Sequence, residues 1–315
     1  MNKLLQGDAL EVLKTLDSES VDCCITSPPY WALRDYGVVG QLGLEPTFQE
    51  YITKLCDIFD EVRRVLKKTG TCWVNLGDSY NNSSWANKES RLDKRRYNLN
   101  TMECGRGGQT NYPDKCLCQI PARFSIEMCN RGWILRNTII WHKPNCMPSS
   151  VKDRFTVDFE YVFFFVKEKK YWFETQYETF LTQENRPHGI VRNREYEYQG
   201  KYKITKQDQL GKATYTGFNH RYSQPEQGRN KRSVWRITTK PFKEAHFAVF
   251  PEELVETPIR AGCPKGGTIL DCFCGSGTTG VVAKRLNRQF IGIELNGEYI
   301  KMAEKRIANT MESLF

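Results

Sequence analysis

Hydrophobic residues along the chain alternate between short continuous runs and runs with helical spacing. Residues 21–25 and 71–76 are short and mostly apolar, as in buried strands, whereas residues 48–66 between them repeat apolar positions every three or four residues. A strand, a helix and a second strand in this order are typical of the βαβ unit of a parallel sheet. The pattern therefore predicts an α/β fold.

The remaining apolar segments extend this prediction toward both ends of the chain. Further strands are expected at 2–6, 133–141, 159–167, 268–271 and 290–293, and further helices at 9–16, 121–130, 281–286 and 299–309. Only a short connection separates the strands at 133–141 and 159–167, which favours an antiparallel pair. The sheet is therefore expected to be mixed.

The hexapeptide Thr26-Ser27-Pro28-Pro29-Tyr30-Trp31 directly follows the strand at 21–25, and two prolines cannot continue a sheet ladder. Because proline fixes φ, the Ser27 side chain and the Pro28 carbonyl can form a rigid pair of acceptors at the carboxyl edge of the sheet, where α/β folds bind ligands. The rings of Tyr30 and Trp31 suit stacking on a planar group. This combination fits the exocyclic amino group of a nucleobase and suggests alkylation of an amine, although a proline pair alone can also be a simple turn.

A second candidate site follows the strand at 268–271. Residues 272–280 form a glycine-rich turn before a helix, and Gly275 and Gly277 allow the backbone to approach a ligand closely. No Lys-Ser/Thr pair follows the glycines, which argues against a P-loop. Glu294 ends the next strand, where nucleotide-binding α/β folds place a carboxylate on ribose hydroxyls. The sequence therefore predicts a ligand that contains ribose.

Positive charge is concentrated in one segment of the chain. The formal net charge is +9, and residues 186–236 hold twelve Lys or Arg against four acids. A localised basic surface is typical of phosphate binding, although a solvated loop explains the charge equally well. Residues 81–115 are also basic and polar, and we expect them to form a mobile loop beside the catalytic pocket. The expected division is 1–171 (first catalytic part), 172–235 (basic lobe) and 236–315 (cofactor part).

Composition excludes several classes of protein. With 39% hydrophobic and 26% charged residues, the 315-residue chain reads as soluble and globular. It has no apolar run of the ~20 residues that span a bilayer and no signal peptide, so neither a membrane partner nor secretion is expected. The twelve cysteines are expected to be reduced thiols. Their spacing lacks the CxxC pairs of structural zinc, and no metal is expected.

Two motifs resemble those of one known family. TSPPYW resembles the [DNS]PP[YFW] catalytic motif of DNA amino-methyltransferases, in which serine is typical of enzymes that act on the cytosine amino group. DCFCGSGTT followed by IGIEL resembles the S-adenosylmethionine site of the same enzymes, commonly DPFxGSGTT, with Cys272 in place of proline. The order of the motifs resembles the circularly permuted β group. The resemblance implies a Rossmann-like, seven-stranded mixed sheet with helices on both faces and adjacent termini. It covers most of residues 1–170 and 230–310 and leaves the basic segment unmatched, and from its charge we expect this segment to form an inserted DNA-recognition lobe.

The resemblance and the charge pattern together give a set of candidate site residues. The catalytic candidates are Ser27, Pro28, Pro29 and Tyr30. The cofactor candidates are Asp8 and Ala9 for adenine, Glu294 for ribose, Asp271, Phe273, Gly275, Gly277 and Thr278 around the methionine part, His246, Phe247, Ala248 and Pro251 on the cofactor's other side, and also Thr26 and Ser276. The DNA-binding candidates are Trp31, Arg34, Arg95, Arg96, Arg192, Arg194, Lys201, Lys203, Arg229, Lys231 and Arg232.

The resulting hypothesis is an enzyme that swings a base out of duplex DNA and transfers a methyl group from S-adenosylmethionine to its amino group. Cytosine is favoured over adenine because serine begins the motif. An RNA or protein amide methyltransferase and a non-catalytic regulator that binds the cofactor are the alternatives. Further expected partners are a second copy of the chain and a cognate restriction endonuclease, in the cytoplasm of a prokaryote or as a phage product.

Overall fold

The computed structural model describes residues 2–81, 112–178, 229–240 and 250–311. The chain divides into two compact units, one formed by 1–174 with 232–315 and the other by 175–231. In the second unit the described elements are the short strands β6 (Tyr177–Glu178) and β7 (Arg229–Asn230), which pair antiparallel. Every feature of the sheet and the candidate site discussed below lies in the first unit.

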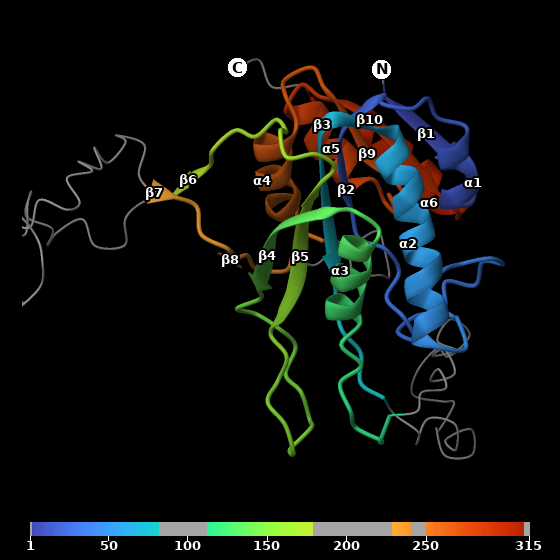
Figure 1. The fold of residues 1–315 in the computed structure, drawn as a ribbon, viewed down its shortest axis with the longest axis vertical. Coiled ribbons are helices and arrows are strands. Elements are labelled where there is room, and N and C mark those ends of the chain that lie inside the picture. Colours follow the sequence, from blue (N-terminus) through green and yellow to red (C-terminus); the bar gives the residue numbers. More distant parts are fainter. Residues whose placement is uncertain (1, 82–111, 179–228, 241–249, 312–315) are drawn as a thin grey trace, which may run out of the picture. The chain divides into compact units, whose positions relative to one another are not determined.

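An eight-stranded sheet forms the centre of the first unit, in the order β1-β10-β9-β2-β3-β5-β4-β8 (Figure 1). The strands are β1 (Lys3–Gln6), β2 (Val21–Thr26), β3 (Leu66–Leu76), β4 (Ile134–His142), β5 (Phe159–Val166), β8 (Val234–Arg236), β9 (Thr268–Asp271) and β10 (Gln289–Glu294). β5 runs antiparallel to both of its neighbours, and all other pairings are parallel. The expected mixed sheet is confirmed.

The number of strands differs from the seven expected. The strand of this sheet that the sequence did not predict is β8, whose three residues pair with the end of β4. Its sequence, VWR, is too short to show any periodicity, and it becomes a strand because β4 offers an open edge.

Helices cover both faces of the sheet, as expected. One hydrophobic cluster joins one face of the sheet to α1 (Ala9–Lys14), α2 (Phe48–Val65) and α3 (Ile120–Asn130). The other joins the opposite face to α4 (Glu252–Gly262), α5 (Thr278–Arg285) and α6 (Gly297–Ala308). Neighbouring residues of one strand enter different clusters, as with Cys72 and Trp73, because side chains alternate across a sheet. Figure 1 shows α2 and α4 on opposite sides of the central strands.

The first strand and the last helix of the first unit lie side by side. β1 pairs with β10, and a Cβ on Gly297 at the start of α6 would lie 3.0 Å from Gln6 Nε2 at the end of β1. The first strand and the last helix are therefore neighbours, as expected. The circular permutation itself stays a prediction.

No helix among the described residues is both long and apolar enough to cross a membrane.

Candidate active site

The Ser27–Tyr30 loop begins where β2 ends, between β9 and β3. Its backbone is held against α2, because the Tyr51 hydroxyl donates to the Pro29 carbonyl at 2.8 Å. A Cβ on Gly43 would lie 3.0 Å from the Tyr30 carbonyl, and one on Gly77 would lie 2.5 Å from the Tyr30 ring. Both positions therefore require glycine, which lets neighbouring segments pack closely on the loop and fix it.

Ser27 is oriented by Asn75, which lies near the end of β3. The Ser27 hydroxyl donates to Asn75 Oδ1 at 3.3 Å. The carboxamide of Asn75 cannot turn over, because its Nδ2 group donates to Glu160 Oε2 at 3.1 Å and to the Tyr161 carbonyl at 3.0 Å. The Ser27 proton therefore points toward Asn75, and the lone pairs of Ser27 Oγ remain available as acceptors.

Glu160, at the start of β5, holds Tyr30 in the same network. The Tyr30 hydroxyl lies 2.6 Å from Glu160 Oε2 and 3.2 Å from Asn75 Oδ1, and its single proton belongs on the nearer, charged acceptor. Loss of solvation and then the charge of Glu160 raise the pKa of Tyr30 well above its usual value, so the hydroxyl stays protonated. Lys143 pairs with the other oxygen of Glu160 and balances its charge.

The candidate catalytic loop is joined to the glycine-rich turn by Asp271, at the end of β9. Asp271 Oδ1 accepts from the Thr26 hydroxyl at 2.7 Å and from the Phe273 N–H at 3.1 Å, and Oδ2 accepts from the Thr279 hydroxyl at 2.5 Å. The side chain is 0% exposed, and its burial raises the pKa to about 6. Thr26 is 245 positions from Asp271 along the chain, and this bond brings the two motifs together at one edge of the sheet.

Most side chains of the turn hold its shape. Arg306 of α6 donates to the Ser276 carbonyl at 2.6 Å, to the Ser276 hydroxyl at 2.8 Å and to the Thr278 hydroxyl at 3.2 Å. A Cβ on Gly277 would lie 2.7 Å from Ala303 Cβ, so this glycine is required by the packing of α6. The side chains of Asp271, Ser276 and Thr278 therefore support the turn from within, and the expected contacts of these residues and Gly277 with the cofactor stay predictions.

Gly275 and Glu294 lie on the open side of the turn. Gly275 has φ +49°, and a Cβ there would meet no described atom within 4 Å. Each oxygen of Glu294 accepts one backbone N–H, from Gly275 at 2.9 Å and from Asn296 at 2.9 Å, and each keeps a lone pair for another donor. Burial raises the pKa of Glu294, which these backbone N–H groups oppose.

Asp8 and Ala9 lie beside Glu294. β1 pairs with β10 up to Gln6 and Glu294, and the Gly7 N–H then donates to the Glu294 carbonyl at 3.0 Å. Asp8 accepts from the Glu11 N–H at 3.1 Å and so caps α1. Its exposed carboxylate and the partly buried ring of Phe273 therefore lie at the same sheet edge as Glu294.

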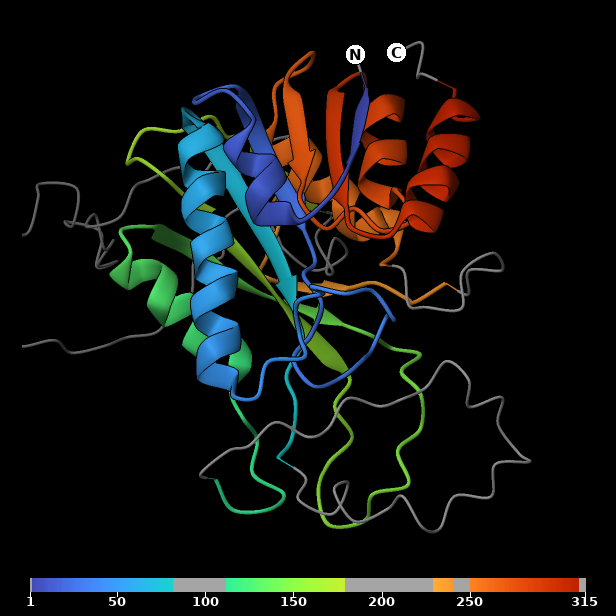
Figure 2. The same ribbon diagram turned by 90° about the vertical axis from the view of Figure 1, so that its right-hand side faces the viewer.

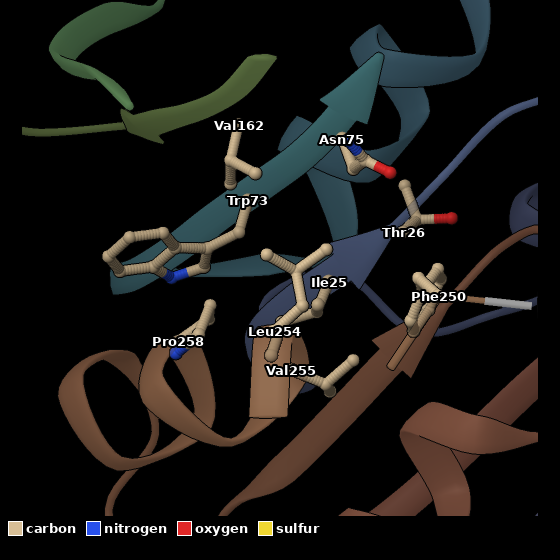
Figure 3. A pocket seen from close by; sticks show the side chains of 9 residues that line it. All are labelled: Ile25, Thr26, Trp73, Asn75, Val162, Phe250, Leu254, Val255 and Pro258. Carbon is tan, nitrogen blue, oxygen red and sulfur yellow. The ribbon is translucent and has the colours of Figure 1, made fainter. Parts of the chain in front are cut away.

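A shallow cleft lies beside the carboxyl ends of β2 and β3 (Figure 3). Thr26 and Asn75 form its polar end, whereas Trp73 and Pro258 lie at the other end. The rest of its lining is apolar and comes from β2, β5, α4 and the segment before α4: Ile25, Val162, Phe250, Leu254 and Val255. Pro251 is buried as the N-cap residue of α4, next to Phe250.

Trp31, which was expected to contact DNA, is buried, whereas two other DNA candidates, Arg34 and Arg232, are at least partly exposed. Trp31 is 3% exposed, its Nε1 donates to the Glu45 carbonyl at 3.0 Å, and its ring packs against Phe48. It therefore belongs to the core, because the chain turns inward after Tyr30. Arg34 is partly exposed beyond this turn, and Arg232 is exposed before β8.

Other DNA candidates lie in the second unit or outside the described residues. In the second unit, Arg229 pairs with Glu178 at 2.9 Å, and the Lys231 N–H donates to the Gln176 carbonyl at 2.8 Å. Outside the described residues lie Arg95, Arg96, Arg192, Arg194, Lys201 and Lys203, and the cofactor candidates His246, Phe247 and Ala248.

Sequence reasoning missed three members of the Tyr30 network: Asn75, Glu160 and Lys143. The available signal was a polar residue within an otherwise apolar strand, as Asn75 is in TCWVNL and Glu160 in FEYVFFFV. A polar residue at such a position needs a partner, and here the partners are one another. Among the described residues, no cluster of three His, Cys, Asp or Glu side chains suits a metal ion.

Comparison with known proteins agrees with this geometry. The family model described as DNA methylase matches residues 21–305. The chain belongs to the DNA methylase family. Among its relatives, the methylase is 40% identical to the Type II methyltransferase M.SmaI of Serratia marcescens over 310 residues, which cover 97% of this chain and 90% of M.SmaI. It is 38% identical to the Type II methyltransferase M.Cfr9I of Citrobacter freundii over 304 residues, covering 96% and 87% of the two chains.

Solved structures share the fold of this methylase. The PvuII DNA methyltransferase (cytosine-N4-specific) matches with a TM-score of 0.62 at 19% identity, over 96% of this chain and 85% of its own. The DNA modification methylase TTHA0409 of Thermus thermophilus, complexed with S-adenosyl-L-methionine, matches with a TM-score of 0.56 at 23% identity, over 98% and 94% of the chains. At these identities the likeness is one of fold.

Proposed function

We propose that this DNA methylase transfers a methyl group from S-adenosylmethionine to the exocyclic amino group of a cytosine extruded from duplex DNA. The observation that carries the proposal is the orientation of Ser27 by Asn75, whose Oδ1 accepts a hydrogen bond from the Ser27 hydroxyl at 3.3 Å. Ser27 Oγ is then an acceptor held in place at the end of β2, one residue after the Thr26 bond to the glycine-rich turn.

The residues at the open side of the turn fit the cofactor. Glu294 offers two carboxylate oxygens to the ribose hydroxyls, and the space beside Gly275 lets a ligand lie against the backbone. We assign Asp8 and Ala9 to the adenine and Phe273 to the methionine part, and the shallow cleft lined by Thr26 and Leu254 lies at the same end of β2. When bound, S-adenosylmethionine supplies an electrophilic methyl group.

The loop residues make the amino group a better nucleophile. An aromatic amine has its lone pair delocalised into the ring, and acceptors that hold its two N–H groups favour the positive charge that develops as the nitrogen is alkylated. We assign these acceptors to Ser27 Oγ and the Pro28 carbonyl, with the Tyr30 ring stacking on the base. No covalent bond to the enzyme is needed, and burial raises the pKa of the Cys23 and Cys272 thiols well above the usual value.

Extrusion of the base follows from the position of the site. Ser27 lies at the end of a central strand, and a base that remains stacked in a duplex cannot bring its amino group to such a position. The double-stranded DNA is then held by basic residues of the chain, with the second unit as the recognition lobe. A homodimer and a cognate restriction endonuclease remain proposed partners.

Cytosine is proposed because serine begins the motif, whereas adenine offers a chemically similar amino group. The direct test incubates the protein with unmethylated bacterial genomic DNA and labelled S-adenosylmethionine, and then identifies the modified nucleoside by mass spectrometry. We expect N4-methylcytosine. N6-methyladenine would refute the choice of base and keep the reaction class, whereas an unmodified DNA with methylated RNA or protein would refute the class of substrate.

The role of Ser27 is tested by Ser27→Ala. Removal of one fixed acceptor is expected to lower kcat by about 10²- to 10³-fold, the range known for preorganised hydrogen-bonding groups. DNA affinity should change little, because the side chain is small and lies away from the duplex backbone. Wild-type turnover by this variant would contradict the proposed role.

A further inference from the structure

The loop between β4 and β5, residues 143–158, has no role in the proposed mechanism, although it begins and ends at the candidate active site. Lys143 at its start pairs with Glu160 just after its end, and Glu160 holds Tyr30. β4 ends and β5 begins at the same sheet edge as the Ser27 loop, and both ribbon views show the long loop extending beyond that edge (Figures 1 and 2). We call residues 143–158 the β4–β5 arm.

The arm carries apolar side chains that face solvent. Phe155 is 96% exposed and Met147 is 87% exposed. An isolated exposed apolar residue is common, but two in one projecting loop beside an active site are candidates for contact with a partner. The charged residues next to Phe155 are Lys152 and Arg154, both exposed, and Asp153, whose charge is balanced by Lys115 at 2.7 Å.

The arm is fastened to its neighbours. The Arg154 guanidinium lies 3.9 Å from the centre of the Tyr80 ring, and the Lys115–Asp153 ion pair joins the same segment. Residues 78–81 and 112–118, which receive these contacts, are themselves paired, since the Cys118 N–H donates to the Ser79 carbonyl at 2.9 Å. Phe155 is therefore presented by a braced loop, which lowers the entropy cost of binding through it.

The distance along the chain limits what can lie against Phe155. Phe155 is five positions before Glu160, and an extended chain spans at most about 3.6 Å per residue, so the backbone of Phe155 lies within about 18 Å of that of Glu160 in the Tyr30 network. Successive bases on one DNA strand are about 3.4 Å apart along the axis. About five base steps span this distance, so a duplex that delivers a base to Ser27 and runs toward the arm would bring neighbouring base pairs to Phe155.

We propose that the β4–β5 arm contacts the DNA duplex beside the extruded base, with Phe155 packing against the bases that the extrusion unstacks and Lys152 lying near the phosphates. Apolar side chains that enter a disrupted base stack are a recurrent means of stabilising deformed DNA. The arm would thus help to hold the base in its extruded position, and it is separate from the basic lobe expected in the second unit. This inference rests on the proposed function, because it requires duplex DNA at the Ser27 edge.

The test compares the full-length wild-type protein with Phe155→Ala, Phe155→Trp and the control Ile126→Ala, which removes another exposed apolar side chain, on α3. The steady-state kinetics of methyl transfer are measured with unmethylated bacterial genomic DNA. We expect Phe155→Ala to lower kcat/KM for DNA by about tenfold or more, the scale of burying one such ring, with KM for S-adenosylmethionine unchanged. Phe155→Trp should keep activity within about threefold, and Ile126→Ala should match the wild type.

Three outcomes would overturn the proposal. If Phe155→Ala has wild-type kcat/KM while the wild type methylates DNA, the proposed function stands and the arm has no part in it. If light scattering shows a wild-type dimer that Phe155→Ala converts to a monomer, the exposed face is a contact between two copies of the chain. If the wild type methylates no DNA, the proposed function and the arm proposal fail together.

Discussion

The orientation of Ser27 by Asn75 can be measured as a coupling free energy. The perturbation is Asn75→Leu, which keeps the size of the side chain. It removes the oxygen near the Ser27 and Tyr30 hydroxyls and the amide group that donates to Glu160 and to the Tyr161 carbonyl. Tyr30 keeps its bond to Glu160 at 2.6 Å, and Lys143 still pairs with that carboxylate, so the rest of the network persists. The change therefore acts mainly on the direction of the Ser27 hydroxyl.

The magnitude follows from the freedom that the hydroxyl regains. Once its acceptor is removed, the Ser27 proton can occupy about three staggered positions, which costs about 0.6 kcal/mol, and lost alignment of the lone pairs adds a similar amount. We expect kcat to fall by about five- to tenfold in Asn75→Leu, against about 10²- to 10³-fold in Ser27→Ala. In the Ser27→Ala background no hydroxyl remains, and Asn75→Leu should then change kcat by less than about twofold.

The assay is single-turnover methyl transfer by the four members of this double-mutant cycle, which separates the chemical step from product release. A suitable control is Ser79→Ala, which removes a hydroxyl that donates to the Trp31 carbonyl at 3.0 Å on the same loop and does not touch Ser27. A coupling near 1 kcal/mol is expected. Fully additive effects of Ser27→Ala and Asn75→Leu would refute the reasoning and show that Asn75 acts through the cleft that it also lines.

Two further predictions concern the glycine-rich turn. Burial raises the pKa of Asp271 to about 6 from an ordinary 3.8, so folding favours the protonated acid. The stability that this group contributes is therefore largest below about pH 4 and is lost by about pH 6, a change of about 3 kcal/mol. Asp271→Asn should abolish this pH dependence in urea unfolding measured from pH 4 to 7. A difference in stability between the wild type and Asp271→Asn that stays constant with pH would contradict this.

Gly275→Ala should weaken cofactor binding in calorimetry by about tenfold or more, because its Cβ would enter the open space beside the turn. The same substitution should lower the free energy of unfolding by under about 1.5 kcal/mol, because its Cβ meets no described atom. Gly277→Ala should instead lower stability by about 2 kcal/mol or more, because its Cβ would lie 2.7 Å from that of Ala303. Equal effects of the two substitutions on binding and on stability would show that this division of roles is wrong.

The parts of the site that sequence reasoning could predict are those set by local geometry. A proline pair after an apolar run must end a strand, and a glycine-rich turn between a strand and a helix must expose backbone N–H groups. Because parallel strands end at the same sheet edge, two such motifs could be expected to meet, and the Thr26–Asp271 bond of 2.7 Å shows that they do. The mixed sheet followed from the short connection between the strands at 133–141 and 159–167, whereas the helices on both faces were implied by the family resemblance.

The parts that could not be predicted depend on contacts between distant residues. Asn75 and Glu160 are 85 positions apart, and neither has a local pattern that names the other. Trp31 looks like a stacking residue in sequence, but the turn after Tyr30 directs it into the core against Phe48. Glycines in a turn also look alike in sequence, whereas only the position of α6 shows that Gly277 serves packing and Gly275 faces open space.

The bond between Thr26 and Asp271 also shows what determines the site. β2 and β9 are hydrogen-bonded neighbours, and Asp271 ties the last residue of one strand to the turn that follows the other. The geometry of the site depends on this adjacency in the sheet, and the chain connecting the two strands can run through either end of the polypeptide. The order of the two motifs along a sequence therefore carries little information about the chemistry. A substitution that breaks the bond, such as Thr26→Val, should disturb methyl transfer and cofactor binding together, because both depend on how these two strand ends are held.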